Sequence, residues 1–575
     1  MKEIFHEVDF CVVGGGLAGL CAAIAAARHG LKVALIHDRP VLGGNASSEV
    51  RMWPSGAWGE NNRETGIIEE LLLENYYLNS LSNYSIWDSV LYGKTRYQDG
   101  ITLICNCSCV SLEMRGNQIA SVKGWQLTTQ TWHTVKAKIF ADCSGDSILA
   151  PLSGAEFRIG RESSKEFDED IEPAAADKNT MGLSCLIQAR ETLSYQKFIP
   201  PKWAYKYAKD EDLPNRPHRI DETNYWWIEV GGVNDGIHDT EQIRDELVKI
   251  AFGVWDHIKN YGDHNADNWA LDWVGFLPGK RESRRYVGDH ILTQNDVRAE
   301  GRFDDIVAYA GWPMDDHNPL GFNYPGEPTI FHPAPSPHGI PYRSLYSRNI
   351  ENLMFAGRNI SVTHVALSST RVMRTCSIIG QAVGTAVSIV LRKQTTPRGV
   401  YNNHIKELQQ ILMEDDCYIP WRTRPIPELS RKAELTASES DPEPLRNGID
   451  RPIGNNNNGW VGKLDSWIQY SFNEPKNIKQ VRLIFDSDLN RKNMALRCYY
   501  PLNIEPYGVP KTIIKEFKIE TQTETGKWET VFSEDNNYQR LVCIPVSVKT
   551  KGIRFVPEST WGAANAAHIF AFDVR

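Results

Sequence analysis

The chain has 575 residues, more than a single hydrophobic core normally organises, so we expect about two to four domains. Hydrophobic residues make up 41% and charged residues 23%, which is typical of a globular protein and excludes a disordered or fibrous one. The net charge of -9 argues against a nucleic-acid binder, which needs a basic surface. The longest apolar run, residues 16–27, is too short for a membrane span.

The N-terminal segment predicts a dinucleotide-binding unit. An apolar run at residues 8–13 precedes GGGLAG at 14–19, an Ala-rich helix follows, and residues 32–36 form a second predicted strand. In this context the first glycine makes the turn, the second admits a pyrophosphate, and the third permits close helix packing. The phosphates lie at the helix N-terminus, where free N–H groups favour anions.

One position departs from this pattern. The second strand of such a unit ordinarily ends in an acid that binds the ribose hydroxyls. Here position 37 is His and Asp38 follows. Either Asp38 takes the role, or His37 contacts the adenosine differently.

Eleven cysteines, an odd number, cannot all be paired in disulfides. Cys105, Cys107 and Cys109 alternate along a predicted strand and share one face. Iron–sulfur motifs usually space their ligands more widely, so we interpret these three as small buried side chains. The N-terminus lacks a charged segment followed by an apolar one, so we expect a cytoplasmic protein, or a periplasmic one if a leader has been removed.

The rest of the chain predicts three further parts. A β-rich stretch with a hairpin over residues 115–117 completes the first part, and residues 155–345 are rich in Trp, Pro, His and charge. A strand at 353–356 and a long helix at 369–392 restore the α/β pattern, before a Pro-rich linker and many short strands. The predicted fold class is α/β: a split Rossmann-type domain, an inserted α+β substrate domain, and a C-terminal all-β sandwich. Their predicted boundaries are 1–154 and 346–425 for the two nucleotide-binding parts, 155–345 for the insert, and 430–575 for the sandwich.

Five ordered motifs then indicate a family. They are GGGLAGL, RPVLGGNASSEVRMW, ADCSGD, NLMFAGRNIS and STRVMRTCSIIGQAVG. Over about residues 1–420 the chain resembles FAD-dependent oxidoreductases of the glutathione-reductase-like superfamily, in particular a branch found in carbohydrate-degrading bacteria. The second glycine-rich element, at 43–48, has no counterpart in simple NAD domains. The resemblance implies an enzyme with FAD as its cofactor.

The resemblance also implies which residues contact FAD. Many relatives carry an acid where this chain has Arg358, so the hydrogen bond to the ribityl chain departs from the family pattern. The implied contacts are Gly14, Gly16 and Gly19 at the pyrophosphate; Asp38 and Arg39 at the ribose; Gly43, Gly44, Asn45 and Ser48 along the pyrophosphate and flavin edge; Val110 near adenine; Ser144, Gly145 and Asp146 in the first nucleotide half; Gly357, Arg358 and Asn359 near the ribityl chain; and Gln381 and Gly384 near the flavin pyrimidine ring.

The loop before the last helix supplies the predicted catalytic groups. His364 is either the general base, because an imidazole titrates near neutrality and alcohol oxidation requires removal of the hydroxyl proton, or a structural loop histidine; the prediction is the base. Arg371 and Arg374 share one helical face and either stabilise the reduced flavin or bind an anionic group. Arg51, two residues after Glu49, either reaches the substrate or forms a structural ion pair with that residue.

Two other clusters leave alternatives open. The basic run at 279–285 either binds an anionic substrate group or forms a structural charge network. His257, Asp263, His264 and Asp267 have no recognised ligand spacing, so no metal site is predicted.

The C-terminal strands resemble a galactose-binding-like module, in which Arg451, Trp460 and Trp467 either form a sugar-binding surface or belong to the core of a docking domain. Tryptophans gathered in the insert favour a sugar, since aromatic faces stack on apolar sugar faces. The predicted function is hydride transfer from a carbohydrate or polyol hydroxyl to flavin, with a sugar or glycoside as substrate and an unidentified electron acceptor. The alternatives are a flavin-assisted glycosidase or lyase with no net redox change, and a non-catalytic carbohydrate-binding protein.

Overall fold

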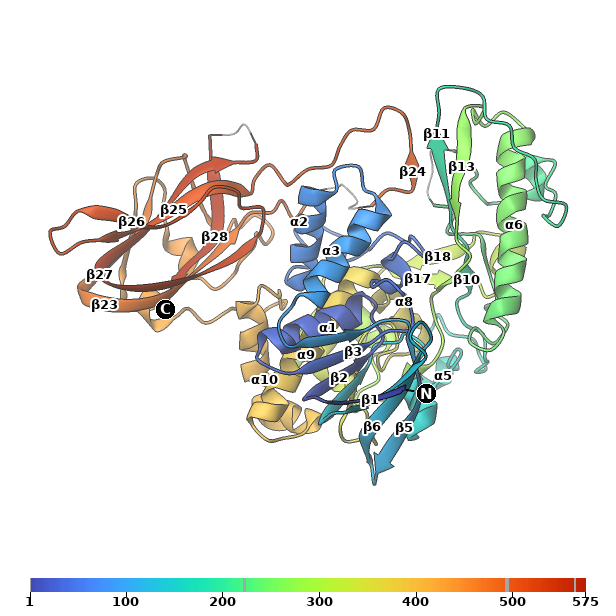
Figure 1. The fold of residues 1–575 in the computed structure, drawn as a ribbon, viewed down its shortest axis with the longest axis horizontal. Coiled ribbons are helices and arrows are strands. Elements are labelled where there is room, and N and C mark those ends of the chain that lie inside the picture. Colours follow the sequence, from blue (N-terminus) through green and yellow to red (C-terminus); the bar gives the residue numbers. More distant parts are fainter. Residues whose placement is uncertain (1, 221–223, 492–495, 563–564) are drawn as a thin grey trace. The chain divides into compact units, whose positions relative to one another are not determined.

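The computed structural model describes residues 2–220, 224–491, 496–562 and 565–575 (Figure 1). These residues form two compact units. The first contains residues 1–58, 81–408 and 494–506, and the second contains 59–80, 409–493 and 507–575. The sequence predicted one uninterrupted C-terminal domain, but β24 (Tyr499–Tyr500) pairs in parallel with β11 (Ile187–Glu191) of the first unit.

The centre of the first unit is a five-stranded parallel sheet, as expected for a Rossmann-type domain. Its strand order is β20-β8-β2-β3-β4, and every neighbouring pair is parallel. Short, fully apolar strands are typical of a sheet that is covered on both faces. The strands are β2 (Phe10–Val13), β3 (Val33–Ile36), β4 (Ile101–Ile104), β8 (Ile139–Asp142) and β20 (Leu353–Phe355).

Two helices pack against each other beside this sheet, α1 (Leu17–Arg28) and α9 (Met373–Arg392) (Figure 1). A Cβ atom added to Gly19, Gly380 or Gly384 would lie within 2.1 Å of a backbone oxygen, so glycine is what permits the close approach. Among the described helices, α9 alone is long and apolar enough to cross a bilayer, but most of that stretch is buried inside the protein.

The predicted helix at 369–392 is in fact two helices. The first, α8 (His364–Thr370), ends before Arg371, and α9 begins after Val372, whose extended backbone (φ -66°, ψ 145°) interrupts the helical path. The other helices of the first unit's nucleotide-binding part are α3 (Tyr84–Arg96), α4 (Leu149–Ser153) and α10 (Pro397–Glu414).

A second sheet, in the order β1-β7-β6-β5, contains the predicted hairpin. Strand β5 (Cys107–Arg115) pairs antiparallel with β6 (Gln118–Gln126), while β1 (Lys2–Glu7) pairs in parallel with β7 (Thr131–Lys136). Cys107 and Cys109 are buried and unpaired, and burial raises the pKa of both thiols, to about 11 and about 12. Cys105 lies before the strand, so the three cysteines do not share one strand face.

The insert has its own core around α6 (Thr240–Asn260). Of the six insert tryptophans predicted to face substrate, Trp227, Trp255 and Trp269 are almost fully buried in that core and are structural, whereas Trp203, Trp226 and Trp273 are not fully buried. The remaining elements are β9 (Phe157–Arg158), α5 (Ser164–Phe167), β10 (Leu183–Ser184), β12 (Glu229–Val230), β13 (Trp269–Val274), β14 (Gly279–Lys280), β15 (Arg285–Tyr286), α7 (Gln294–Arg298), β16 (Ile306–Ala310), β17 (Met314–His317), β18 (Thr329–His332) and β19 (His338–Pro341).

The second unit is an extensive antiparallel β structure. Two predicted strands, at 467–472 and 480–485, belong to one long strand with register shifts, β23 (Ile468–Phe485). Trp460 is fully buried in the core, and Arg451 is buried with its guanidinium bonded to the carbonyl oxygens of Asn61 and Arg63. Both residues are therefore structural rather than part of a sugar-binding surface. The unit's other elements are α2 (Ile67–Leu78), α11 (Glu428–Lys432), β21 (Glu434–Ala437), β22 (Trp460–Gly462), β25 (Ile514–Gln522), β26 (Trp528–Glu534), β27 (Leu541–Thr560) and β28 (Ala567–Val574).

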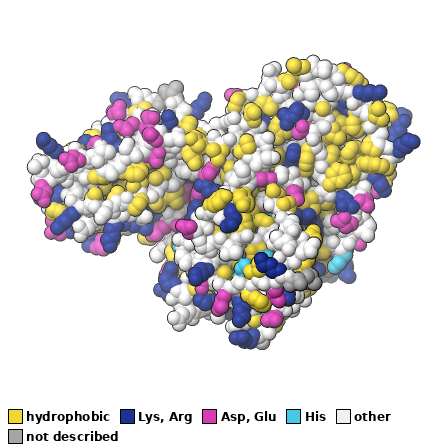
Figure 2. Space-filling model, viewed as in Figure 1, with side chains coloured by type: hydrophobic (Ala, Val, Ile, Leu, Met, Phe, Trp, Pro, Cys, Tyr) yellow, Lys and Arg dark blue, Asp and Glu magenta, His cyan; other side chains and the backbone are white. Residues whose placement is uncertain are grey.

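The surface agrees with the acidic composition. On the face drawn in Figure 2, basic and acidic side chains are interspersed rather than gathered into a continuous basic area. This distribution is unlike the positive footprint that nucleic-acid binding requires.

Candidate active site

A cavity of about 670 Å³ lies in the first unit at the carboxyl edge of the parallel sheet. Residues that directly follow the strands line it, including Gly14 after β2, His37 after β3 and Cys143 after β8. Its volume falls within the roughly 300–1,000 Å³ of small-molecule and cofactor sites. Open α/β sheets bind nucleotides at this edge, so the cavity has the position expected of a dinucleotide site.

The glycine turn leaves room for a phosphate group. Gly14 has φ +106°, and an added Cβ would lie 2.4 Å from the carbonyl carbon of Cys143, so only glycine fits. Gly16 instead has an ordinary φ of -64° and its nearest potential neighbour, the Cα of Gly44, is 4.0 Å away. Gly16 therefore opens space at the N-terminus of α1, where backbone N–H groups attract a pyrophosphate.

The structure answers the question raised by His37. Its Nδ1 accepts the N–H of Gly15 (2.9 Å), and its Nε2 donates to the carbonyl oxygen of Val41 (2.9 Å). Burial lowers the pKa of His37, consistent with this neutral form. Both ring nitrogens of His37 therefore bind backbone groups. Asp38 is exposed on the cavity wall, with Arg39 Nε 3.9 Å from its Oδ2, and it remains the predicted ribose ligand.

Most of the residues implied to contact FAD line the cavity. They are Gly14, Gly16, Asp38, Arg39, Gly43, Gly44, Asn45, Ser144, Gly145, Asp146, Gly357 and Arg358.

The other implied contacts have different positions, among the residues that the structure describes. Gly19 packs against the carbonyl oxygen of Gly14 in the glycine turn, Gly384 packs against Ala22 of α1, and Gln381 is buried on α9. The N–H of Ser48 donates to Asp88, and Asn359 donates to the carbonyl oxygen of Asp142.

Val110 is exposed and points away from the cavity, whose wall is formed instead by Cys107, Ser108 and Cys109. The pairing of β5 with β6 shifts register between Cys109 and Ser111, so Val110 lies at a β-bulge rather than in regular alternation.

Arg358 replaces the acid of many relatives, and the structure gives it a partner. Its Nη2 lies 2.9 Å from Asp146 Oδ1, while Lys280 Nζ lies 2.8 Å from Asp146 Oδ2. Burial alone would raise the pKa of Asp146, but Arg358 and Lys280 hold it below its usual value. The two cations give this part of the wall a net positive charge, which suits an anionic cofactor.

Besides the cluster around Asp146, the part of the cavity formed by the insert contains a cluster of polar side chains centred on His317. Its Nδ1 lies 2.7 Å from Glu229 Oε2, and its Nε2 lies 3.2 Å from Asp315 Oδ2. Arg281 pairs with Glu229 at 3.2 Å, and Arg371 pairs with Asp315 at 2.9 Å. All five side chains are largely buried, and each carboxylate keeps a guanidinium partner besides the imidazole.

These contacts determine the charge of the two acids. Burial raises the pKa of Glu229, but Arg281 and His317 lower it below its usual value. Burial acts the same way on Asp315, and His317 and Arg371 hold its pKa far below the usual range. Both groups are therefore carboxylates at neutral pH, able to orient the imidazole.

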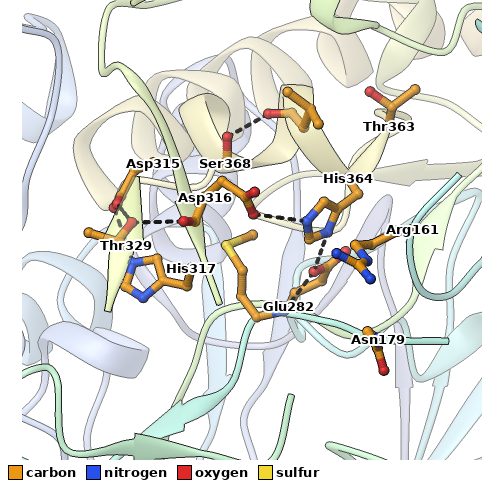
Figure 3. Close-up of polar contacts among 12 residues, drawn as sticks. Arg161, Asn179, Glu282, Asp315, Asp316, His317, Thr329, Thr363, His364 and Ser368 are labelled. Carbon is orange, nitrogen blue, oxygen red and sulfur yellow. Dashed lines mark hydrogen bonds and ion pairs between the residues drawn. The ribbon is translucent and has the colours of Figure 1, made fainter. Parts of the chain in front are cut away.

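His364 lies elsewhere than the sequence predicted (Figure 3). It is not among the described residues that line the cavity, and it is 1% exposed. Its Nδ1 lies 2.8 Å from Glu282 and its Nε2 lies 3.2 Å from Asp316. Burial lowers the pKa of His364, but Glu282 and Asp316 raise it well above the usual value. His364 is enclosed by two carboxylates and lies off the described cavity wall, so the geometry argues against it as the base for a substrate in the cavity.

The two predicted arginines besides Arg371 also lie off the described cavity wall. Arg51 donates to Gln188 Oε1 (2.7 Å) and packs against the ring of Trp273, so it joins the second glycine element to the insert rather than pairing with Glu49. The backbone N–H of Arg374 donates to the carbonyl oxygen of Ser55.

The basic run at 279–285 has residues on the cavity wall, where an anionic group could bind, and residues in a structural charge network. Lys280, Arg281 and Arg284 line the cavity, whereas Arg285 is buried and pairs with Glu162 (3.1 Å) and Glu282 (3.4 Å).

Aromatic side chains complete the wall near His317. Trp226 lies edge-on to the His317 ring with centroids 5.3 Å apart, and Trp312 Nε1 donates weakly to Asp315 at 3.4 Å. Trp58 contacts Trp312 and stacks with Phe331. Trp226 and Trp312 belong to the predicted insert, whereas Trp58 lies in the first nucleotide-binding part.

The sequence analysis missed His317, Asp315 and Glu229. A signal was available for two of them, since the segment MDDH at 314–317 carries two acids and a histidine in consecutive positions. Nothing in the spacing indicated Glu229, which is 88 residues from His317 in the chain.

The fold and the cavity define a dinucleotide-binding oxidoreductase scaffold of the flavoprotein type. Comparison with protein families agrees: the model described as "FAD dependent oxidoreductase" matches residues 9–412. The chain belongs to this family, is an FAD-dependent oxidoreductase, and has FAD as its cofactor. The glycine turn, the space at Gly16 and the basic wall fit that group.

Individual relatives are more distant. The chain is 37% identical over 69 residues to glycerol-3-phosphate dehydrogenase of Mycobacterium leprae and to glycerol-3-phosphate dehydrogenase 2 of Mycobacterium tuberculosis, which covers 12% of this chain and 12% of each relative. A geranylgeranyl bacteriochlorophyll reductase-like protein from Thermoplasma acidophilum is 11% identical over 72% of this chain and 85% of that one, with a TM-score of 0.33. A family 32 carbohydrate-binding module from Streptococcus pneumoniae is 13% identical over 25% of this chain and 95% of that one, with a TM-score of 0.20.

Proposed function

We propose that this oxidoreductase oxidises a hydroxyl group of a carbohydrate or polyol, with His317 as the acceptor of the hydroxyl proton. FAD, when bound, accepts the hydride from the carbon that carries the hydroxyl. The observation that supports the proposal is that His317, held between two carboxylates, shares a cavity wall with tryptophan rings.

While Nε2 of His317 contacts Asp315 it carries a proton, because a carboxylate only accepts hydrogen bonds; Nε2 becomes a proton acceptor when a substrate hydroxyl displaces Asp315 and that proton has left the ring. The shorter bond, from Nδ1 to Glu229, fixes the ring, and Arg281 in turn holds Glu229. The longer contact joins Nε2 to Asp315, which also accepts hydrogen bonds from Thr329 (2.6 Å) and Arg371 (2.9 Å). A substrate hydroxyl can replace Asp315 at Nε2 without leaving that carboxylate unpaired. A histidine in this position is the common general base in such chemistry.

The reaction balances on the substrate. The O–H proton passes to His317, the C–H hydrogen leaves with its electron pair to the cofactor, and the alcohol becomes a carbonyl compound. Arg371 on the wall stabilises negative charge that develops on the oxygen as the proton leaves.

The wall also suits a sugar-like molecule. Trp226, Trp312 and Trp58 offer aromatic faces for apolar C–H surfaces, and the adjoining charged groups bind hydroxyls. The mycobacterial relatives are named for a polyol ester, glycerol 3-phosphate, which supports an alcohol as substrate class. The chain spans about an eighth of the length of these curated relatives, so their activity is not carried over whole.

The test is anaerobic mixing of the FAD-loaded protein with separate sugars, glycosides and polyols, while the absorption of oxidised flavin is followed. We expect one of these classes to bleach the flavin, and the His317→Gln variant to bleach far more slowly with the same compound. Failure of every class to bleach the flavin would contradict the proposal. Repeated turnover without any external acceptor would instead indicate a glycosidase or lyase with no net redox change.

A further inference from the structure

Three histidines and one aspartate converge in the insert, outside the active-site cavity. They are Asp210 at the start of η2 (Asp210–Asp212), His218 in the loop that follows, His257 in the last turn of α6, and His264 in the next loop. One ligand atom of each residue lies within 4.8 Å of the other three. The sequence indicated no metal site, because Asp210 and His218 are distant from the other pair in the chain.

The distances resemble the edges of a small polyhedron around one ion. Asp210 Oδ1 lies 3.2 Å from His257 Nε2, 3.7 Å from His218 Nε2 and 3.9 Å from His264 Nε2. The Nε2 atoms of His257 and His264 are 3.1 Å apart. Zinc–nitrogen bonds of about 2.0–2.1 Å place tetrahedral ligand atoms about 3.3 Å from one another.

Hydrogen bonds at Nδ1 leave the Nε2 atoms of His218 and His257 unprotonated and directed toward the middle of the cluster. His218 Nδ1 donates to the carbonyl oxygen of Arg216 (2.7 Å), and His257 Nδ1 donates to that of Tyr207 (3.0 Å). A neutral imidazole that donates through Nδ1 has a lone pair on Nε2, and this arrangement is the usual outer shell of a metal-bound histidine. The lone pair on Nε2 of His257 faces Nε2 of His264 at 3.1 Å, a contact that either a proton on His264 or a bound cation stabilises.

Burial and backbone shape also favour an ion. The His257, His264 and His218 side chains are 0%, 9% and 14% exposed, while Asp210 is 68% exposed and forms the solvent side of the group. Gly262 has φ +83°, and an added Cβ would lie 2.9 Å from His264 Nε2 and 3.6 Å from Asp210 Oδ1. A side chain at Gly262 would therefore crowd the centre.

We infer that Asp210, His218, His257 and His264 form a structural zinc site. Three neutral nitrogens and one carboxylate in a tetrahedral set suit Zn²⁺, and four protein ligands leave no position open for substrate. The ion would join the segment at 207–218 to the end of α6, and so stabilise the insert from which Glu229 and Arg281 enter the active site.

The test uses the untagged, FAD-loaded protein, stripped with a chelator and then given zinc alone. We expect one zinc ion per chain by elemental analysis, and the visible absorption of tetrahedral cobalt after Co²⁺ is supplied instead. Chelation should lower the melting temperature and expose the segment at 207–218 to proteolysis, while the flavin spectrum stays unchanged.

Two variants and a control make the test specific. An Asp210→Asn/His264→Gln double variant should lose more than about 100-fold in zinc affinity, since loss of an outer-shell partner alone costs about 10–100-fold. Gly262→Ala keeps all four ligands but fills the centre, so it should also lose zinc. The control is His238→Gln, an exposed histidine of the insert paired with Asp235, which should bind zinc like the wild type. The inference is overturned if the wild type takes up no stoichiometric zinc, or if both variants bind it as tightly as the control.

Discussion

The two faces of strand β17 carry two similar histidine clusters with different surroundings. Asp315 and His317 lie on one face, where His317 sits between Glu229 and Asp315 on the cavity wall. Asp316 lies on the other face and reaches His364, which sits between Asp316 and Glu282 inside the protein (Figure 3). A histidine flanked by two carboxylates is therefore not a catalytic site by itself, because access to the cavity decides what it can do.

The clusters also differ in their cations. On the cavity face, Arg281 pairs with Glu229 and Arg371 pairs with Asp315, so the imidazole is not the sole positive partner of either acid. On the buried face, the charge of His364 balances Asp316, and Glu282 also lies near Arg285. This contrast predicts that loss of His317 affects the reaction, and that loss of His364 affects the fold.

The different roles of His317 and His364 depend on FAD binding in the cavity. The Gly16→Val variant tests whether FAD binds there. The backbone at Gly16 is ordinary, so valine should fold but place its methyl groups where the pyrophosphate binds. We expect loss of the bound-flavin spectrum with unchanged circular dichroism. Gly93→Val, in open space on α3, is the matched control and should keep its flavin. Full flavin binding by Gly16→Val would place the cofactor elsewhere.

Replacing His317 with Gln should lower the rate constant of flavin reduction by about 10²–10⁴-fold, the usual contribution of a general base. Glutamine still bonds to Glu229 but does not accept the proton. Rapid mixing under anaerobic conditions measures this rate. Reduction at the wild-type rate would show that the cavity face supplies the base through another residue.

Replacing His364 with Gln should lower the free energy of unfolding by about 3–5 kcal/mol, because Asp316 and Glu282 lose a buried cation. We expect the rate of flavin reduction per bound flavin to change much less than in His317→Gln. Denaturant unfolding and rapid mixing on the same preparation measure both effects. A large loss of rate with unchanged stability would reverse the assignment of the two faces.

Another buried histidine, His338, has no carboxylate contact among the residues that the structure describes, and so shows what burial does to an imidazole that no carboxylate holds. Its Nδ1 donates to the carbonyl oxygen of Pro335, its Nε2 faces Ser369 Oγ, and burial lowers its pKa from 6.5 to about 4. The folded state therefore favours the neutral ring, and the stability it confers is present above pH 6.5 and is lost as the pH falls toward 4. This loss amounts to about 3 kcal/mol.

The His338→Gln variant lacks this titration, so its unfolding midpoint should fall less than that of the wild type between pH 7 and about pH 4. Denaturant curves of both proteins at several pH values measure the difference. If the stabilities of the wild type and the variant fall equally between pH 7 and about pH 4, burial does not lower the pKa of His338 in the folded protein.

The smallest expected effect concerns substrate binding on the cavity face. Trp226→Leu removes a ring beside His317 and should raise KM about 2–12-fold, the equivalent of about 0.5–1.5 kcal/mol of aromatic contact. Trp203→Leu, a half-exposed tryptophan that packs on Phe252 away from the cavity wall, should leave KM unchanged. Equal effects of both changes would point to the insert's stability rather than to contact with substrate.

Local spacing allowed much of the nucleotide-binding part to be predicted. The turn at Gly14, the helix that starts at Leu17 and the strand that follows are all determined within about 25 residues, where propensity and turn chemistry act directly. The same reasoning did not predict the break at Val372 that separates α8 from α9. Single-residue register and a break at Val372 depend on packing that no local pattern reveals.

The sequence by itself indicated the family and the FAD cofactor, because five ordered motifs carry the resemblance and the second glycine-rich element distinguishes the chain from simple NAD domains. Tertiary structure alone decided which histidine faces the cavity and which four residues meet at the zinc site. Glu229 and His317, or Asp210 and His264, come from distant segments, and only the packing of those segments brings their side chains within bonding distance.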